Sequence, residues 1–157
     1  MSGCECKPDR AQPSRKGTVR ALFVASGKGK HVRVDSVGVI PAGFDGDYHS
    51  VPANRRQILL MSASILEEFQ LEPGAIFENA VVDGIDVMSL SEGQRLRFGS
   101  AIVEVTIPCE PCGRMDRVRS GLRQALQNRR GMFVKVVNPG SVTIGDTVEV
   151  MPSPVTA

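Results

Sequence analysis

Two of the four cysteines in this 157-residue chain stand three positions apart, in the stretch IPCEPCGRMD that contains Cys109 and Cys112. Such a pair can clip a metal ion, form a disulfide, exchange electrons, or offer one thiolate to an external ligand. A four-thiolate zinc site would also need Cys4 and Cys6, which stand in a polar segment near the start of the chain. A thioredoxin-like redox pair needs a βαβ setting, whereas this pair follows a strand-like run. Buried, inert thiols also stay open, because free cysteine packs like a small apolar residue.

The neighbours of the two thiols favour a thiolate that binds something. Pro108 and Pro111 each precede a cysteine and make the segment extended and stiff. Arg114, Arg117 and Arg119 follow, and if they lie close in space their charge lowers the pKa of a thiol. Thiolates prefer the softer transition metals. One protein thiolate cannot hold such a metal alone, so a bound cofactor would supply the remaining ligands.

Two further segments concentrate polar side chains. The stretch GFDGDYH (43–49) carries Asp45 and Asp47, which could bind a cation or form turns through their own side chains. Glu78 and Asn79 stand between apolar neighbours, which predicts a structural hydrogen-bonded pair near the core. Cysteine-protease chemistry would need a histidine beside a thiol, and no local signature supports that arrangement.

Two arginine doublets flank predicted elements, Arg55–Arg56 and Arg129–Arg130. Solvated surface charge is the ordinary interpretation of such doublets. Arginine also binds phosphate through two parallel hydrogen bonds. The doublets are therefore candidates for recognising a phosphate group.

Composition narrows the class of protein. The chain is 41% hydrophobic and 23% charged, with a formal net charge of +2 and no tryptophan. Such a small charge and so few aromatic residues argue against a nucleic-acid partner. No apolar run is long enough to cross a membrane, and the first fifteen residues lack the apolar region of a signal peptide. We expect a cytoplasmic protein with reduced thiols and no membrane partner.

Short apolar runs separated by glycine turns predict a mainly β chain. One hairpin is expected to join 18–26 to 31–40, and a second to join 96–98 to 101–107. Further strands are expected at 56–61, within 71–87, and over 131–151. Short helices are expected over 62–71, with a capping box of Ser64 and Glu67, and over 120–129, with Ser120 as N-cap.

These elements predict a closed or partly closed β-barrel with two or three short helices. At this length one domain is expected. The predicted organisation is a flexible N-terminal tail over 1–16, a single domain over 17–152, and a C-terminal tail over 153–157.

Several of these pieces occur in the order that is typical of one family. The sequence resembles the MOSC domain, the C-terminal domain of molybdenum cofactor sulfurase. The matching stretches are GFDGDYH (43–49), RRQILLMS (55–62), PGAIFENAVVDGIDV (73–87), LSEGQRLRFGSAIVEVT (90–106), PCGRMD (111–116) and RRGMFVKVVNPGSVTIGDTVEV (129–150). The match looks closest to small stand-alone bacterial members, without the PLP-dependent desulfurase domain of the full sulfurase. The resemblance implies no PLP site in this chain.

The resemblance implies a barrel-like MOSC fold, similar to the β-barrel domain of pyruvate kinase. It also implies binding of the molybdenum cofactor (molybdopterin), with a cysteine as sulfur ligand or persulfide acceptor. Cys112 fits the family pattern best as metal ligand and catalytic thiol, and Cys109 is the second choice for the metal ligand. The residues expected to bind the cofactor or line its pocket are Asp47, His49, Arg55, Arg56, Asn79, Arg114 and Arg130.

The activity that the resemblance implies is reduction of N-hydroxylated compounds, or transfer of sulfur or cofactor. A reductase would take a small-molecule substrate and need an electron-donor protein, because no flavin, haem or iron–sulfur signature is present. The first alternative is a non-catalytic cofactor or sulfur carrier served by a sulfur-donor desulfurase. The second alternative is a small zinc-stapled domain.

Overall fold

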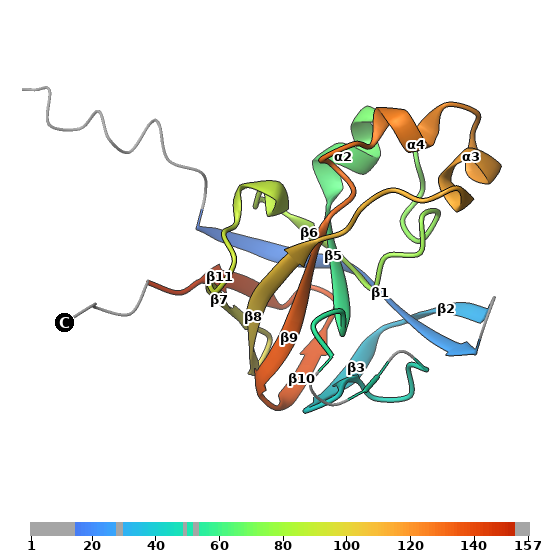
Figure 1. The fold of residues 1–157 in the computed structure, drawn as a ribbon. Helices are drawn as coiled ribbons and strands as arrows, with labels where there is room; N and C mark the ends of the chain where they lie inside the picture. Colours follow the sequence, from blue (N-terminus) through green and yellow to red (C-terminus); the bar gives the residue numbers. More distant parts are fainter. Residues whose placement is uncertain (1–14, 28–29, 49, 52–53, 153–157) are drawn as a thin grey trace, which may run out of the picture.

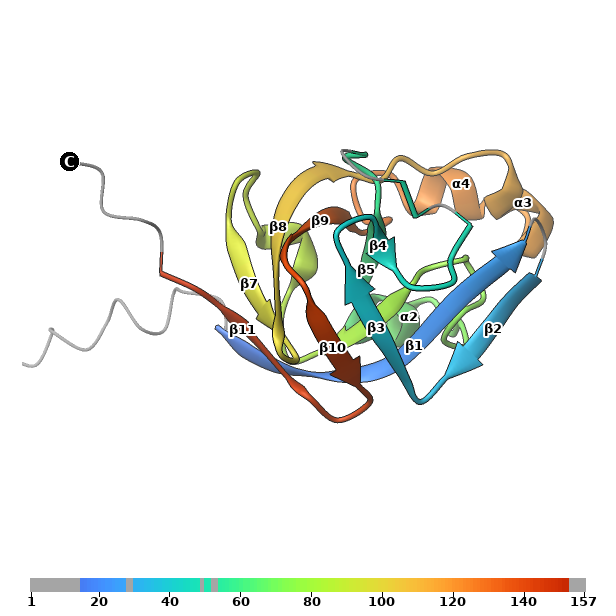
Figure 2. The same ribbon diagram turned by 90° about the horizontal axis from the view of Figure 1, so that it is seen from below.

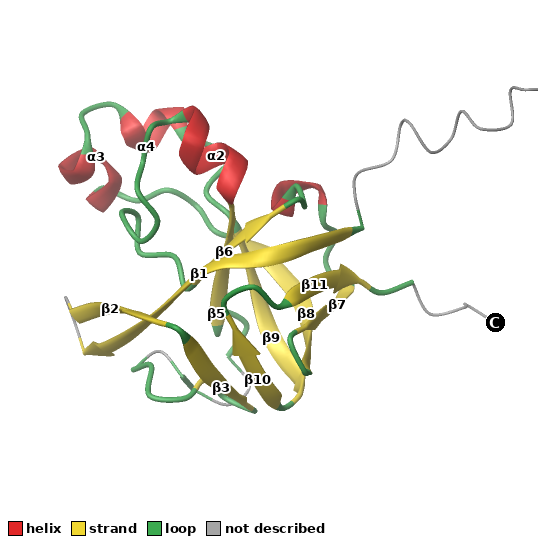
Figure 3. Ribbon diagram, turned by 180° about the vertical axis from the view of Figure 1, so that it is seen from behind, coloured by secondary structure: helices red, strands yellow, loops and turns green. Residues whose placement is uncertain are grey.

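A computed structural model of the chain describes residues 15–27, 30–48, 50–51 and 54–152. The described chain is mainly β, with three short α-helices gathered on one side (Figure 3). This confirms the predicted fold class. Strand β1 begins at Lys16, one residue before the predicted start of the domain. Most of the predicted N-terminal tail, with Cys4 and Cys6, and the predicted C-terminal tail lie outside the described residues.

Seven strands close into a barrel (Figure 1). Their order around the barrel is β11-β7-β8-β9-β5-β6-β1, and an antiparallel pairing of β1 with β11 closes the ring. All neighbours are antiparallel except β5 and β6, which run parallel because helix α2 crosses between them. The bounds are β1 Lys16–Gly27, β5 Ile58–Ser62, β6 Ala80–Asp83, β7 Arg95–Phe98, β8 Ala101–Pro108, β9 Met132–Asn138 and β11 Thr147–Val150.

The long strand β1 leaves the barrel at its C-terminal end. There it pairs with β2 (Lys30–Val34), so the predicted first hairpin is confirmed. The expected second strand of this hairpin is interrupted at Asp35, where the chain passes into a separate sheet. That sheet contains β3 (Ser36–Ile40), β4 (Gly43–Phe44) and β10 (Gly140–Thr143). It lies in front of the barrel in Figure 2, and Val39, Phe44 and Val142 pack into the barrel core.

Alternation along the strands divides the apolar side chains between two cores. Leu60 and Val82 point into the barrel, where Phe44 stacks on Phe98 with ring centroids 6.3 Å apart. Their neighbours Met61 and Val81 point outward and pack under the helices. A strand that is buried on both faces needs a continuous apolar run. The run ILLM in β5 has this character, and all of its residues are buried.

The helices cover the outer core. They are α2 (Ala63–Glu68), α3 (Arg114–Val118) and α4 (Leu122–Ala125), and a 3-10 turn, η2, spans Val87–Ser89. Helix α2 confirms the helix expected over 62–71, but the predicted capping box is wrong, because the N-cap is Ser62. The Ser62 hydroxyl instead donates to Ile85 O and accepts from the backbone N–H of Val87, which ties β5 to η2.

The other two helices differ more from expectation. The N-cap of α4 is Gly121, at φ +84°, so the prediction of Ser120 is wrong. Helix α3 was not predicted. The segment 71–87 contains only the short strand β6, and turns occupy much of the rest. Among the described helices, none has the length and apolar character needed to cross a membrane.

Candidate functional site

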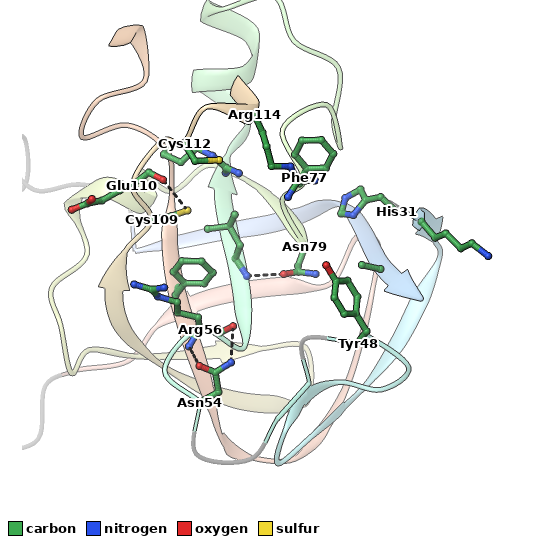
Figure 4. Close-up of a pocket in the computed structure, with 15 residues that line it drawn as sticks. His31, Tyr48, Asn54, Arg56, Phe77, Asn79, Cys109, Glu110, Cys112 and Arg114 are labelled. Carbon is green, nitrogen blue, oxygen red and sulfur yellow. Dashed lines mark hydrogen bonds between the residues drawn. The ribbon is translucent and has the colours of Figure 1, made fainter. Parts of the chain in front are cut away.

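A pocket of about 340 Å³ opens beside the two cysteines (Figure 4). The β1–β2 hairpin, the loop after β4, and the segments that follow β8 and precede β9 all contribute to it. Such a volume falls in the range of small-molecule sites, roughly 300–1,000 Å³. Its lining residues are Ala25, Lys30, His31, Tyr48, Asn54, Arg56, Leu59, Phe77, Asn79, Cys109, Glu110, Cys112, Arg114, Arg130 and Phe133.

Both thiols line this pocket, and the segment that carries them is anchored at each end. The backbone N–H of Cys109 donates to Gly131 O at 2.9 Å, which fixes the end of β8 beside β9. Gly131 has φ +118°, and a Cβ there would collide with the carbonyl oxygen of Leu60, so glycine is required. At the other end, Met115 donates its N–H to Cys112 O at 2.9 Å and is itself fully buried. Cys112 is exposed, whereas Cys109 is half-buried.

Burial is the main influence on the pKa of Cys109, the inner of the two thiols. It raises the pKa of Cys109, and the nearby charges of Arg130 and Arg56 offset the rise only in part. The charges of Cys112 and Glu110 contribute to the raised pKa of Cys109. The expectation that arginines of the 114–119 segment favour a thiolate therefore does not hold for Cys109. Arg119 instead donates to the carbonyl oxygens of Phe69 and Gln70.

Asn79 ties together the floor of the pocket. Its Oδ1 accepts the backbone N–H of Leu59 at 2.9 Å, and its Nδ2 donates to Phe23 O at 3.3 Å. Nδ2 also donates to Asp47 Oδ2 at 3.1 Å, and that oxygen accepts the N–H of Ala25 at 2.9 Å. Asn79 thus joins β1 and β5 to the loop after β4. Asp47 does not line the pocket itself, but its hydrogen bond holds Asn79 in position.

Arg130 lines the pocket and carries buried hydrogen-bond donors that no group within the described chain satisfies. The residue is 5% exposed, and Nη2 donates to Ile76 O. Nε and Nη1 are buried and have no partner among the described residues. The fully buried Glu78 presents a similar case, since Oε2 accepts the N–H of Gly74 at 2.6 Å while Oε1 has no described partner. Buried polar atoms without a partner need one from outside the described chain, which ordered water or a bound ligand can supply.

The remaining predicted arginines divide between the pocket and the surface. Arg56 and Arg114 line the pocket, and each lies over a phenylalanine, Phe133 at 6.0 Å and Phe77 at 3.9 Å to the ring centroid. Arg55 does not line the pocket, because its guanidinium pairs with Glu92 at 2.7 Å on the surface. His49, the other predicted pocket residue, lies outside the described residues.

The side of the pocket formed by the β1–β2 hairpin was not predicted from the sequence. His31 stacks on Phe23 with ring centroids 5.0 Å apart, meets Phe77 edge-on at 6.1 Å, and its Nε2 bonds Glu78 O at 2.9 Å. Lys30 and Tyr48 complete this side. The alternating pattern of the hairpin predicted strands, but it carried no signal that one end leaves the barrel to border a pocket.

The predicted zinc clip stays untested. Within the part of the chain that the structure describes, no group of three or more histidine, cysteine or acidic residues could hold a metal ion by itself. The clip would need Cys4 and Cys6, which lie outside that part. A metal ion at Cys109 or Cys112 would therefore need further ligands from a bound molecule.

Comparison with known proteins agrees with this architecture. The YuaD protein from Bacillus subtilis superposes with a TM-score of 0.75 at 24% identity, over 86% of this chain and 95% of its own. YiiM from Escherichia coli superposes with a TM-score of 0.68 at 23% identity, over 90% of this chain and 72% of its own. No curated protein of similar sequence was found. The sequence pattern of the MOSC domain matches residues 47–149, a span that includes both thiols, Asn79 and Arg130. The chain belongs to the MOSC domain family.

Proposed function

We propose that the pocket binds the molybdenum cofactor and that the loaded protein reduces N-hydroxylated small molecules. The observation that carries the proposal is the pairing, in one pocket, of an exposed thiol with a buried arginine that has two unsatisfied donors. A soft thiolate suits molybdenum. A buried guanidinium suits a phosphate oxygen. The molybdenum cofactor contains both molybdenum and a phosphate group, so the thiol and guanidinium groups of the pocket fit it.

The residues that would hold the cofactor follow from their positions. Cys112 would be the protein ligand of the metal, because its sulfur is exposed on the pocket wall, and Cys109 is the second choice. Arg130 and Arg56 would bind the phosphate, because both line the pocket and two donors of Arg130 have no partner among the described residues. Asn79, held by Asp47, would orient the pterin by hydrogen bonds at the floor.

The chain itself supplies orientation and a partly dry environment. Leu59 and Phe133 give the pocket apolar walls beside its cations, which strengthens each electrostatic contact inside. When bound, the cofactor supplies a two-electron redox centre. The overall reaction converts R–NHOH, two electrons and two protons into R–NH₂ and water, so the N–O bond breaks and oxygen leaves as water. The electrons come from a donor protein, and we place the reaction in the cytoplasm.

The alternative is a carrier that receives cofactor or sulfur from a partner desulfurase and passes it on. The exposure of Cys112 favours this second function, because a persulfide there would be accessible to an acceptor protein. A reductase forms many product molecules per bound molybdenum, whereas a carrier does not.

The test uses protein purified from a host that makes the cofactor, with molybdenum content measured first. Loaded protein, a reduced electron donor and benzamidoxime are mixed, and benzamidine is quantified by chromatography. The reductase proposal predicts many turnovers per molybdenum. At most one product per molybdenum would reject the reductase and support the carrier.

A further inference from the structure

The cations of the pocket lie at several points of its lining. Arg130 bonds Ile76 O, next to Phe77, and the charges of Arg130 and Arg56 act on Cys109. Arg114 lies against Phe77, on the side of the pocket that includes His31 (Figure 4). The described lining contains four cationic side chains, the fourth being Lys30, and one carboxylate, Glu110. A phosphate monoester carries at most two negative charges, so a phosphate and Glu110 together leave this lining with a net positive charge.

The same protein shows how an arginine stacked on a phenylalanine is completed elsewhere. Arg129 lies over the Phe69 ring at 5.3 Å, and its two Nη atoms bond both carboxylate oxygens of Glu68, at 2.7 and 2.6 Å. Arg114 lies closer to its ring, 3.9 Å from the Phe77 centroid. Within the described chain, however, no carboxylate or carbonyl oxygen bonds its guanidinium. Arg114 is exposed at the pocket, so a carboxylate of a bound molecule can reach its guanidinium as Glu68 reaches that of Arg129.

The backbone of Phe77, on the side of the pocket beside Arg114, is strained. Phe77 has φ +68°, a conformation that is unfavourable for a bulky residue. Gln70 and Asn128 also have positive φ, but they follow α2 and α4, where a left-handed residue commonly ends a helix. No helix end explains Phe77. Its N–H bonds Gly74 O at 3.1 Å, and the edge contact with His31 fixes the ring beside Arg114. Strain of this kind concentrates at ligand-binding positions.

We propose that Arg114 and Phe77 form a carboxylate-binding subsite, and that the substrates of this pocket are N-hydroxylated compounds bearing a carboxylate on a planar group. The guanidinium offers two parallel donors to the carboxylate, as Arg129 does to Glu68. The planar part of the substrate packs along Phe77 and Tyr48, which border the same opening. The substrate class rests on the proposed function, whereas the carboxylate subsite can be tested without the cofactor.

Two small probes that differ by one carboxylate test the subsite. Benzamidoxime and 4-carboxybenzamidoxime are titrated into the full chain, labelled with nitrogen-15, and binding is followed by NMR. Inorganic phosphate is present throughout to occupy Arg130 and Arg56. The parent is compared with Arg114→Gln, Arg114→Lys and Arg117→Gln. Arg117 is the matched control, because it lies in the same helix but does not line the pocket.

We expect the parent to bind the carboxylate probe about tenfold more tightly than the neutral one, as a charge-assisted bidentate contact provides. The preference should fall below about twofold in Arg114→Gln, shrink in Arg114→Lys because the planar fork is lost, and persist in Arg117→Gln. Rising salt should reduce it.

Three results would overturn the subsite. They are equal affinity of the two probes in the parent, no binding of either probe, and an undiminished preference in Arg114→Gln, which would place the carboxylate at another part of the pocket. The titration involves no metal. A failure of molybdenum loading would therefore reject the proposed function and leave the carboxylate preference as measured.

Discussion

Replacing Asn79 by alanine should remove the link between the floor of the pocket and the barrel. The substitution leaves the buried N–H of Leu59 without its acceptor, which costs about 1–3 kcal/mol. It also takes one donor from the buried Asp47 carboxylate, and a hydrogen bond to a charged group contributes about 1.5–3 kcal/mol. The longer bond to Phe23 O adds less.

The expected loss of unfolding free energy is about 3 kcal/mol, at the lower end of these sums, because water in the adjoining pocket can serve one of the exposed groups. For a domain of this size the midpoint of thermal unfolding should fall by roughly 6–12 °C. The assay is urea unfolding followed by circular dichroism, together with a thermal scan.

Asn138→Ala provides the control, since Asn138 is an exposed residue at the end of β9 and should change stability by less than about 0.5 kcal/mol. A loss below about 1 kcal/mol in Asn79→Ala would show that Asn79 does not hold the floor of the pocket.

Three further predictions follow from the same geometry. Alkylation by iodoacetamide near neutral pH should modify the exposed Cys112 before Cys109, and the Cys109 rate should keep rising at higher pH because burial raises its pKa; peptide mass spectrometry gives each rate, and equal rates would contradict the assigned burial. Gly131→Ala should cost more than about 2 kcal/mol, because it combines a positive φ with a collision at Leu60 O, whereas Gly145→Ala has a positive φ in open space and should cost about 1 kcal/mol; similar costs in denaturant unfolding would show that the β9–β5 approach is not tight. Deleting residues 1–14, with Cys4 and Cys6, should leave the thermal midpoint within about 2 °C, and stoichiometric zinc that disappears on deletion would favour the zinc-stapled alternative.

Local patterns were enough to predict the strands of the barrel. The apolar run of β5 and the hairpin of β7 and β8 appear where alternation and glycine turns placed them. The break at Asp35 was missed, because a change of sheet leaves no mark on local alternation. The capping box was wrong because Ser64 and Glu67 match the pattern locally, whereas the helix begins one residue after Ser62, whose hydroxyl is already bonded to Ile85 and Val87.

The candidate site was only partly readable from the sequence. The sequence indicated Cys112, Asn79 and Arg130 through motifs, and the structure brings them to one pocket. It did not distinguish Arg55 from Arg56. Adjacent residues on an extended segment point to opposite sides, but the sequence does not show which side faces the pocket. The fold shows that Arg55 pairs with Glu92 on the surface. Phe77 and His31 could not be found either. Their contact depends on a strained backbone and on a hairpin that packs against a loop distant in the sequence.

The cofactor content of cysteine variants shows whether Cys112 is the metal ligand. Parent, Cys112→Ser and Cys109→Ser are purified under reducing conditions from a cofactor-making host, and molybdenum, zinc and pterin are quantified per chain. We expect Cys112→Ser to lose molybdenum, because a hydroxyl is a poor replacement for a soft thiolate, and Cys109→Ser to retain it. Equal molybdenum in the parent and Cys112→Ser would contradict the assignment of Cys112 as the metal ligand.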